Sequence, residues 1–213
     1  MKTAESDVFD RLFSSYPELL CCEGAVLASY EVLADVYDNG CKLLICGNGG
    51  SAADSEHITG ELMKGFNLKR PLSAGQRKAF SGFDNAQYIA DNLQNALPAI
   101  SLVSQTALMT AFLNDVAPDM LFAQQVFGYL TPGDALIALS TSGGSANVVN
   151  AACTAVAQGG SVVAITGRKK SRLSDVATVT INLPADTPFE VQELTLPVYH
   201  AICAALELRY FDK

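Results

Sequence analysis

Short, continuous apolar runs alternate along the chain with longer stretches of helical periodicity. The apolar runs have the length of buried strands and lie at residues 42–46, 99–103, 134–139, 161–166 and 176–183. Helices are predicted over residues 5–38, 52–64, 105–115, 118–130, 146–158 and 190–211. Buried strands that alternate with helices indicate a parallel sheet covered on both faces. The pattern therefore predicts an α/β fold, a three-layer αβα sandwich.

One segment, residues 73–96, interrupts this alternation. It mixes polar residues with two glycines and contains no strong strand, although a helix over 84–96 fits its composition. The whole chain has 213 residues, close to the length of a single domain. We therefore predict one domain over residues 1–213, with N-terminal helices at about 5–38 and an irregular segment at about 73–96.

Composition excludes several classes of protein. Hydrophobic residues make up 49% of the chain and charged residues 17%, which is too apolar for a disordered protein. The net charge of -8 argues against nucleic acid as a partner, but backbone amides can still bind a small anion. No run approaches the ~20 apolar residues that span a bilayer, and the N-terminus lacks a signal-peptide pattern. We expect a cytoplasmic protein with no membrane partner, and its six dispersed cysteines predict neither disulfides nor a zinc–thiolate site.

Two predicted strands run directly into a loop of glycine and hydroxyl residues that is followed by a helix. The loops are GNGGS at 47–51 and STSGGS at 140–145. In an open parallel sheet such loops lie at the carboxyl ends of the strands, where ligands bind. Glycines let the backbone approach a ligand, and the helix N-terminus offers N–H groups to an anion. Two such loops predict a phosphate site, although tight turns use the same residues and Ser145 could be only a helix cap.

The first loop also fits the dinucleotide-binding pattern G-x-G-x-x-A, through Gly47, Gly49 and Ala52. That pattern requires an acidic residue about 20 residues further on, at the end of the next strand, to bind a ribose. Here the chain reads FNLKRPL at 66–72, without an acid and without a strand. We therefore expect no nucleotide.

The chain has two histidines, each with a possible partner at helical spacing. His57 and Glu61 are four residues apart on the helix after the first loop, so they share a face. His200 shares a face with Glu193 and nearly with Gln192, about two turns earlier, and Pro197 between them is expected to kink or delimit that helix. Spacing alone fits a structural role for each histidine, but the position of His57 and Glu61 beside a phosphate loop favours function.

Some neighbouring residues have ordinary structural interpretations. Tyr199 and Cys203, which flank His200, are interpreted as packing residues. The basic stretch at 168–170 is interpreted as a solvated turn, with a phosphate contact as the alternative.

Three motifs together resemble the SIS (sugar isomerase) domain family: GNGGSAADSEHITGEL at 47–62, STSGGSANVVNA at 140–151 and VQELTLPVYH at 191–200. Within this family the chain looks like the phosphoheptose isomerase branch, over about residues 30–211. The resemblance implies a flavodoxin-like, five-stranded parallel sheet with N-terminal helices. It also implies a homotetramer whose active sites lie at subunit interfaces.

The resemblance further implies roles for individual residues. Glu61 would be the general base and His200 its acid partner, in a proton transfer between C1 and C2 through an enediol(ate). Some members of the family bind one zinc ion per subunit through residues that match His57, Glu61, Gln192 and His200, although Gln is a weak zinc ligand. The residues expected to bind the sugar phosphate are Asn48, Gly49, Gly50, Ser51, Ser140, Thr141, Ser142, Ser145 and Gln192.

The chain also departs from the isomerase pattern. Gln105 stands where the isomerases usually carry an acid, Phe189 where they often have Asp, and Gly144 where they have Asn. Residues 73–96 form an insertion relative to the family, which could be a lid, an interface element or a tolerated surface loop. These departures bear on the substrate more than on the reaction.

Two functions of different classes follow from the resemblance. The first is a phosphosugar aldose–ketose isomerase that converts sedoheptulose 7-phosphate to D-glycero-D-manno-heptose 7-phosphate, or acts on a related sugar phosphate. The alternative is a non-catalytic tetrameric SIS protein that binds a phosphosugar or a protein partner, like those that associate with the replication initiator DnaA. Those proteins carry Asn at the position of His200, so the histidine here favours the enzyme.

Overall fold

The apolar runs form a five-stranded, wholly parallel sheet in the computed structural model, which describes residues 3–212. The strands are β1 (Leu43–Cys46), β2 (Ala99–Ser101), β3 (Ala135–Leu139), β4 (Ser161–Thr166) and β5 (Val179–Asn182). Their order across the sheet is β2-β1-β3-β4-β5. From β1 the chain adds β2 on one side of the sheet and then β3, β4 and β5 on the other side. Open α/β sheets bind ligands at such a switch point, which here lies between β1 and β3.

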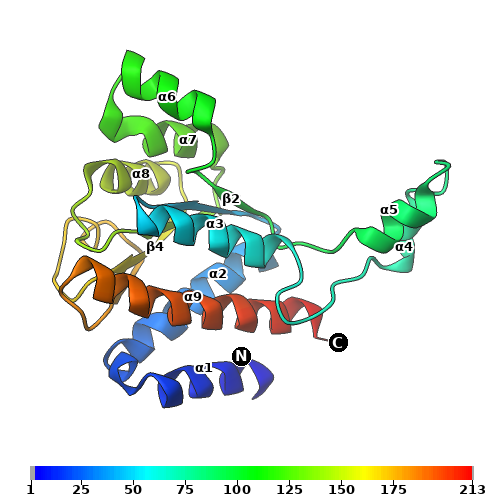
Figure 1. The fold of residues 1–213 in the computed structure, drawn as a ribbon, viewed down its shortest axis with the longest axis horizontal. Helices are drawn as coiled ribbons and strands as arrows, with labels where there is room; N and C mark the ends of the chain where they lie inside the picture. Colours follow the sequence, from blue (N-terminus) through cyan, green and yellow to red (C-terminus); the bar gives the residue numbers. More distant parts are fainter. Residues whose placement is uncertain (1–2, 213) are drawn as a thin grey trace.

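Helices cover both faces of the sheet, as the sequence predicts (Figure 1). Alternate strand residues point to opposite faces, so Leu43 and Ile45 join one apolar core and Leu44 and Cys46 the other. The first face carries α2 (Glu23–Asp38), α3 (Gly50–Met63) and α9 (Pro188–Phe211), with α1 (Thr3–Ser15) packed outside them. The second face carries α7 (Leu121–Tyr129) and α8 (Ala146–Ala157), with α6 (Thr106–Asp115) beyond them.

Prolines divide two of the predicted helices. The predicted helix 5–38 is interrupted by a 3-10 turn, η1 (Pro17–Cys22), and the predicted helix 118–130 begins with another, η2 (Pro118–Met120). Pro197 does not end α9, which continues from Pro188 to Phe211 as one helix (Figure 1). Glu193, whose carbonyl faces the proline ring, is exposed, so solvent can reach the backbone group that the proline leaves unpaired.

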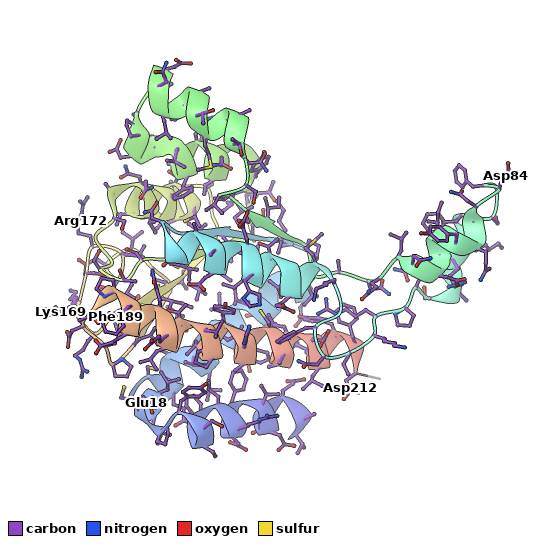
Figure 2. All side chains as sticks on the ribbon, in the orientation of Figure 1. Glu18, Asp84, Lys169, Arg172, Phe189 and Asp212 are labelled. Atoms are coloured by element: carbon purple, nitrogen blue, oxygen red, sulfur yellow. The ribbon has the colours of Figure 1, made fainter. Side chains whose placement is uncertain are left out.

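Residues 72–96 form an arm that projects from the rest of the structure, with Asp84 at its tip (Figures 1 and 2). It contains α4 (Ala74–Lys78), which was not predicted, and α5 (Ala86–Asn92), which is shorter than the predicted helix 84–96. Of the residues of the arm, only Ala90 is buried. The arm therefore adds little to the hydrophobic core.

A buried ion pair ties the loop before the arm to α9. The Glu207 carboxylate accepts a hydrogen bond from Arg70 Nε at 2.8 Å and others from the backbone N–H groups of residues 66–68. Arg70 also donates to the carbonyl oxygens of Leu62, at 2.7 Å, and Glu61, at 3.0 Å. These bonds fix the C-terminal end of α3, and with it the backbone of Glu61.

All six cysteines are free thiols, and Cys203 packs in the core as expected. Burial raises the pKa of Cys46 and of Cys203 to about 12. In the described part of the chain no helix is long and apolar enough to cross a membrane.

Candidate active site

The two glycine-rich loops lie side by side at the switch point, because they follow the neighbouring strands β1 and β3. Gly49 precedes α3 with φ of +57°, a conformation that favours glycine. The side chains of Asn48, in the first loop, and Asn147, in the first turn of α8, exchange two hydrogen bonds of 2.9 Å. The sequence reasoning missed Asn147, although it lies inside the second motif. Both loops lie at the carboxyl ends of their strands, as the sequence predicts.

The second loop presents a set of hydroxyl groups around a tight turn. Gly143, at φ of +62°, donates its N–H to the carbonyl of Ser140 at 3.0 Å. Ser140 is buried and donates through Oγ to Ser145 Oγ at 3.1 Å, while Thr141 and Ser142 are more accessible. Ser145 stands at the N-cap of α8, but its side chain makes no capping hydrogen bond. Its hydroxyl is therefore not explained as a cap.

A cavity of about 190 Å³ opens beside the second loop. It is lined by Thr141 and Ser142 and, from the turn after β4, by Arg168 and Lys169. Arg168 is held in this turn by a hydrogen bond to the Pro184 carbonyl and an ion pair with Asp186. The basic turn thus lies next to the hydroxyl groups, which fits the phosphate contact that the sequence left as an alternative.

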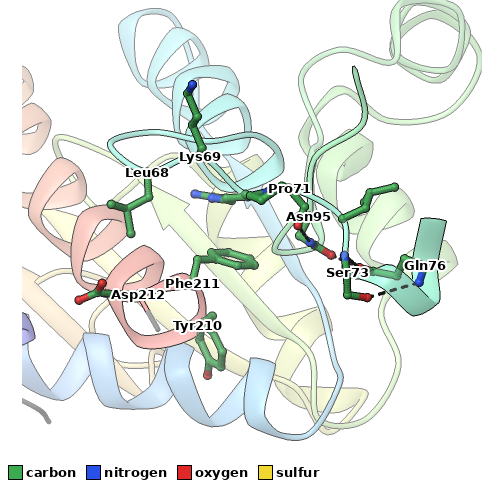
Figure 3. A pocket seen from close by; sticks show the side chains of 11 residues that line it. Leu68, Lys69, Pro71, Ser73, Gln76, Asn95, Tyr210, Phe211 and Asp212 are labelled. Atoms are coloured by element: carbon green, nitrogen blue, oxygen red, sulfur yellow. Dashed lines mark hydrogen bonds between the residues drawn. The ribbon is translucent and has the colours of Figure 1, made fainter. Parts of the chain in front are cut away.

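A larger cavity, of about 710 Å³, lies away from these loops at the base of the arm (Figure 3). Tyr210 and Phe211 line it from the end of α9, and Ser73 and Gln76 line it from α4. None of the predicted site residues lines this cavity. We therefore do not assign the reaction to it.

The helices α3 and α9 run parallel, and Gln192 lies at their shared beginning. The Gln192 amide packs directly on the Cα of Gly50, where a methyl group would lie only 2.6 Å from Nε2. A side chain at position 50 would displace the flexible Gln192 amide, which with glycine there lies at the N-terminus of α3, beside the first loop. The predicted phosphate residues from three parts of the chain are thus adjacent.

Further along the same two helices, the histidines meet. His57 Nε2 lies 3.2 Å from Glu61 Oε1 on α3 and 3.4 Å from His200 Nε2 on α9. His57 Nδ1 lies 2.9 Å from the Tyr199 hydroxyl. Glu61 is 9% exposed, and Lys64 Nζ lies 3.4 Å from its Oε2. The predicted pair of His57 and Glu61 is confirmed, and His200 joins it from a helix more than a hundred residues away in the chain.

Burial sets the electrostatics of this cluster. It lowers the pKa of His200 because a buried charge is disfavoured, and the neighbouring His57 lowers this pKa further, whereas the Glu61 carboxylate raises it. A neutral His200 is therefore favoured at neutral pH. Burial also raises the pKa of Asp54, one turn before His57 on α3.

The zinc prediction requires His57, Glu61, Gln192 and His200 to converge on one ion. The first, second and fourth of these side chains lie together, whereas Gln192 packs at the other end of the paired helices. Among residues 3–212, no group of three or more His, Cys, Asp and Glu side chains is arranged so that it could hold a metal ion. As placed, these side chains do not fit a zinc site, and we derive no step through a metal.

Comparison with known proteins agrees with these motifs. The SIS domain model matches residues 99–208. Phosphoheptose isomerase of Geotalea daltonii is 34% identical over 88% of this chain and 85% of its own length, and that of Thiobacillus denitrificans is 37% identical over 79% and 75%. This chain belongs to the SIS domain family. Among solved structures of the family, the phosphoheptose isomerase from Francisella tularensis has a TM-score of 0.73 at 25% identity, covering 97% of this chain and 98% of its own.

The departures from the isomerase pattern lie at the rim of this SIS domain. Phe189 is 62% exposed in the first turn of α9, at one end of the molecule (Figure 2). Gln105 precedes α6, and its neighbour Ser104 donates to Glu56 Oε1, on α3, at 2.8 Å. Gly144 is exposed, and its N–H donates to Ser142 Oγ at 3.2 Å. None of the three lies among the hydrogen-bonded side chains around His57.

Proposed function

We propose that this chain is a phosphosugar aldose–ketose isomerase that interconverts sedoheptulose 7-phosphate and D-glycero-D-manno-heptose 7-phosphate. The observation that carries the proposal is the arrangement along α3 and α9. The first glycine-rich loop leads into α3, the hydroxyl-rich second loop lies beside it, and Glu61 lies with two imidazoles further along α3 and α9. Phosphoheptose isomerases 32–37% identical to the chain support the same substrate.

The spacing along α3 suits a long phosphosugar. Gly50 and His57 are separated by a helical rise of roughly 10 Å. Extended chains span about 1.2 Å per bond, so C1 of a heptose 7-phosphate lies about 10 Å from its phosphorus, and that of a triose phosphate only about 5 Å. A heptose phosphate held at the first turn of α3 therefore reaches the imidazoles, whereas a triose phosphate does not.

The side chains divide the proton transfers between them. The Glu61 carboxylate takes the proton from the carbon next to the carbonyl and returns it to the neighbouring carbon, through an enediol(ate). His200, which is favoured as the neutral form, donates a hydrogen bond to the substrate oxygen as negative charge develops there and moves the hydroxyl proton between O1 and O2.

The test is to incubate the protein with sedoheptulose 7-phosphate in heavy water and follow the sugar by NMR. We expect aldose product and deuterium at C1 or C2, and a loss of about 10²–10⁴-fold in rate for Glu61→Gln. Glu193→Gln, at an exposed glutamate on α9, is the matched control and keeps the natural rate. Folded natural protein that exchanges no deuterium, with or without added zinc, contradicts the assignment.

Three finer parts of the assignment remain predictions. A homotetramer with active sites at subunit interfaces is tested by light scattering on the purified protein. One zinc ion per subunit is tested by metal analysis, and a cytoplasmic location by cell fractionation.

A further inference from the structure

One pair of amide side chains ties the first glycine-rich loop to the helix that follows the second. Asn48 Nδ2 donates to Asn147 Oδ1 at 2.9 Å, and Asn147 Nδ2 donates to Asn48 Oδ1 at 2.9 Å. Each side chain both donates and accepts, which an amide can do and a carboxylate cannot. The pair therefore links the loop after β1 to the helix after β3 by two matched hydrogen bonds.

The two partners differ in how firmly the rest of the fold holds them. Three of the five residues of the first loop are glycines, which leave its backbone much conformational freedom. Asn147 lies in the first turn of α8, where the next two residues, Val148 and Val149, are buried in the second core. Its Oδ1 also accepts from Val148 N at 3.0 Å. The amide pair thus anchors a glycine-rich loop to a helix that the core holds in place.

This anchor matters because the groups suited to a phosphate are divided between the two loops. Ser145, the last residue of the second loop, precedes Asn147 by two residues, so the anchor lies beside the hydroxyl groups. In the part of the chain that the structure describes, the backbone N–H groups of Gly49 and Gly50 have no hydrogen-bond partner. A phosphate that bonds to both loops needs them at one fixed separation, and ordering a free loop at that moment would weaken its binding.

We propose that Asn147 is a positioning residue, which holds the first loop beside the second through Asn48 and so prepares the phosphate site before the sugar binds. The inference rests on the proposed function, in which both loops bind the phosphate. In this arrangement the Asn48 side chain serves Asn147, and residue 48 contributes to the sugar site through the backbone of its loop.

Asn147→Ala removes both hydrogen bonds and keeps a good helix former in α8. We expect KM for sedoheptulose 7-phosphate to rise about tenfold with kcat unchanged, because the loss falls on binding of the phosphate and not on the reacting carbons. Asn150→Ala is the matched control, since Asn150 lies on the same helix and donates to the Asp119 carbonyl at 2.9 Å. We expect the control to keep the natural KM. A folded Asn147→Ala variant with the KM of the control contradicts the proposal.

The double variant separates an anchor from a direct contact with the sugar. If Asn147 acts through Asn48, then Asn48→Ala, Asn147→Ala and the variant with both changes share one raised KM, because each removes the same pair of bonds. If the Asn48 side chain itself binds the sugar, Asn48→Ala raises KM more than Asn147→Ala does. That second result contradicts the role given to the Asn48 amide.

Hydrogen exchange tests the anchor without any substrate. The N–H groups of Ser51 and Ala52 bond to the carbonyls of Asn48 and Gly49, so opening of the loop exposes them to exchange. Mass spectrometry of peptides that cover residues 47–53 should show exchange about tenfold faster in Asn147→Ala than in the natural chain or Asn150→Ala. Equal exchange in all three overturns the proposal. A chain whose loop exchange depends on Asn147 but that turns over no heptose phosphate contradicts the proposed function and leaves the anchor in place.

Discussion

Gly50 is the residue of α3 that packs on Gln192 of α9. Its Cα faces the Gln192 amide so closely that any side chain would displace that amide. Gly60, on the same helix, has no neighbour within 4 Å of the corresponding position. A Cβ atom therefore has free space at position 60 but meets the Gln192 amide at position 50, although both residues lie within α3.

Gly50→Ala should move the Gln192 amide away from the first loop and weaken binding of the sugar phosphate. A hydrogen bond to a charged group contributes about 1.5–3 kcal/mol, so we expect KM to rise tenfold or more. Steady-state kinetics with sedoheptulose 7-phosphate measures this. Gly60→Ala should leave KM unchanged and add about 1 kcal/mol or less to stability. Equal KM values for the two variants would show that Gln192 does not bind the substrate.

The sequence predicts contacts between residues of one helix better than contacts between residues of different helices. The spacing of His57 and Glu61 places both on one face of α3, which the structure confirms. Tyr199 was interpreted as a packing residue, and this interpretation is incomplete. Its ring is indeed buried, but helical periodicity does not reveal that its hydroxyl reaches the neighbouring helix.

Between elements, the Arg70–Glu207 pair joins α9 to the end of α3. Both side chains are almost fully buried, at 0% and 1% exposure. Their remaining hydrogen-bonding groups pair with backbone groups of residues 61–68. The pair is therefore part of a satisfied network, and removal of one partner leaves the other charge buried without compensation.

Arg70→Met should lower the free energy of unfolding by about 3–5 kcal/mol, because Glu207 keeps its charge in an apolar site. Denaturant titration followed by circular dichroism measures the change. Lys170→Met is the control, since the ion pair of Lys170 with Asp175 is exposed, and we expect no measurable change. A loss for Arg70→Met no larger than that of the control would mean that the buried network adjusts without cost.

The sequence signals for helix starts differ in how well they predict the observed helices. The sequence analysis predicted a helix at 84–96 but did not predict α4, a five-residue helix with a capping box between Ser73 and Gln76. This S-x-x-Q signal is present in the sequence and could have located the helix start. At Pro17 the sequence indicates that a second helical segment begins, and the structure shows a 3-10 turn, Pro17–Cys22, that begins there.

For the whole molecule, the arm is the feature that the sequence predicts least. The family resemblance predicts the sheet correctly, since buried apolar runs determine it. The arm carries large apolar residues, but Phe83, Tyr88 and Leu93 are exposed, so burial against a core does not set its direction, which depends on a few contacts at its base. There Asn95 N donates to the Arg70 carbonyl at 2.7 Å, and Pro71 pairs with Gln94.

Replacing residues 72–93 by two glycines should leave the rest of the fold intact, because Ala90 is the only buried residue removed. We expect the thermal unfolding midpoint to stay unchanged in calorimetry. Light scattering on the same sample reports the oligomeric state. A lower midpoint that accompanies smaller particles would contradict this expectation and show that the arm holds subunits together.

The last helix of the chain, α9, supplies Gln192, Tyr199, His200 and Glu207, while Glu61 and both glycine-rich loops come earlier. Synthesis proceeds from the N-terminus, so a growing chain can build its sheet before α9 is available. Until then the sheet face that α9 covers remains open and prone to aggregation. The protein thus completes its candidate site and buries this sheet face in the same event, the docking of the 24-residue helix α9.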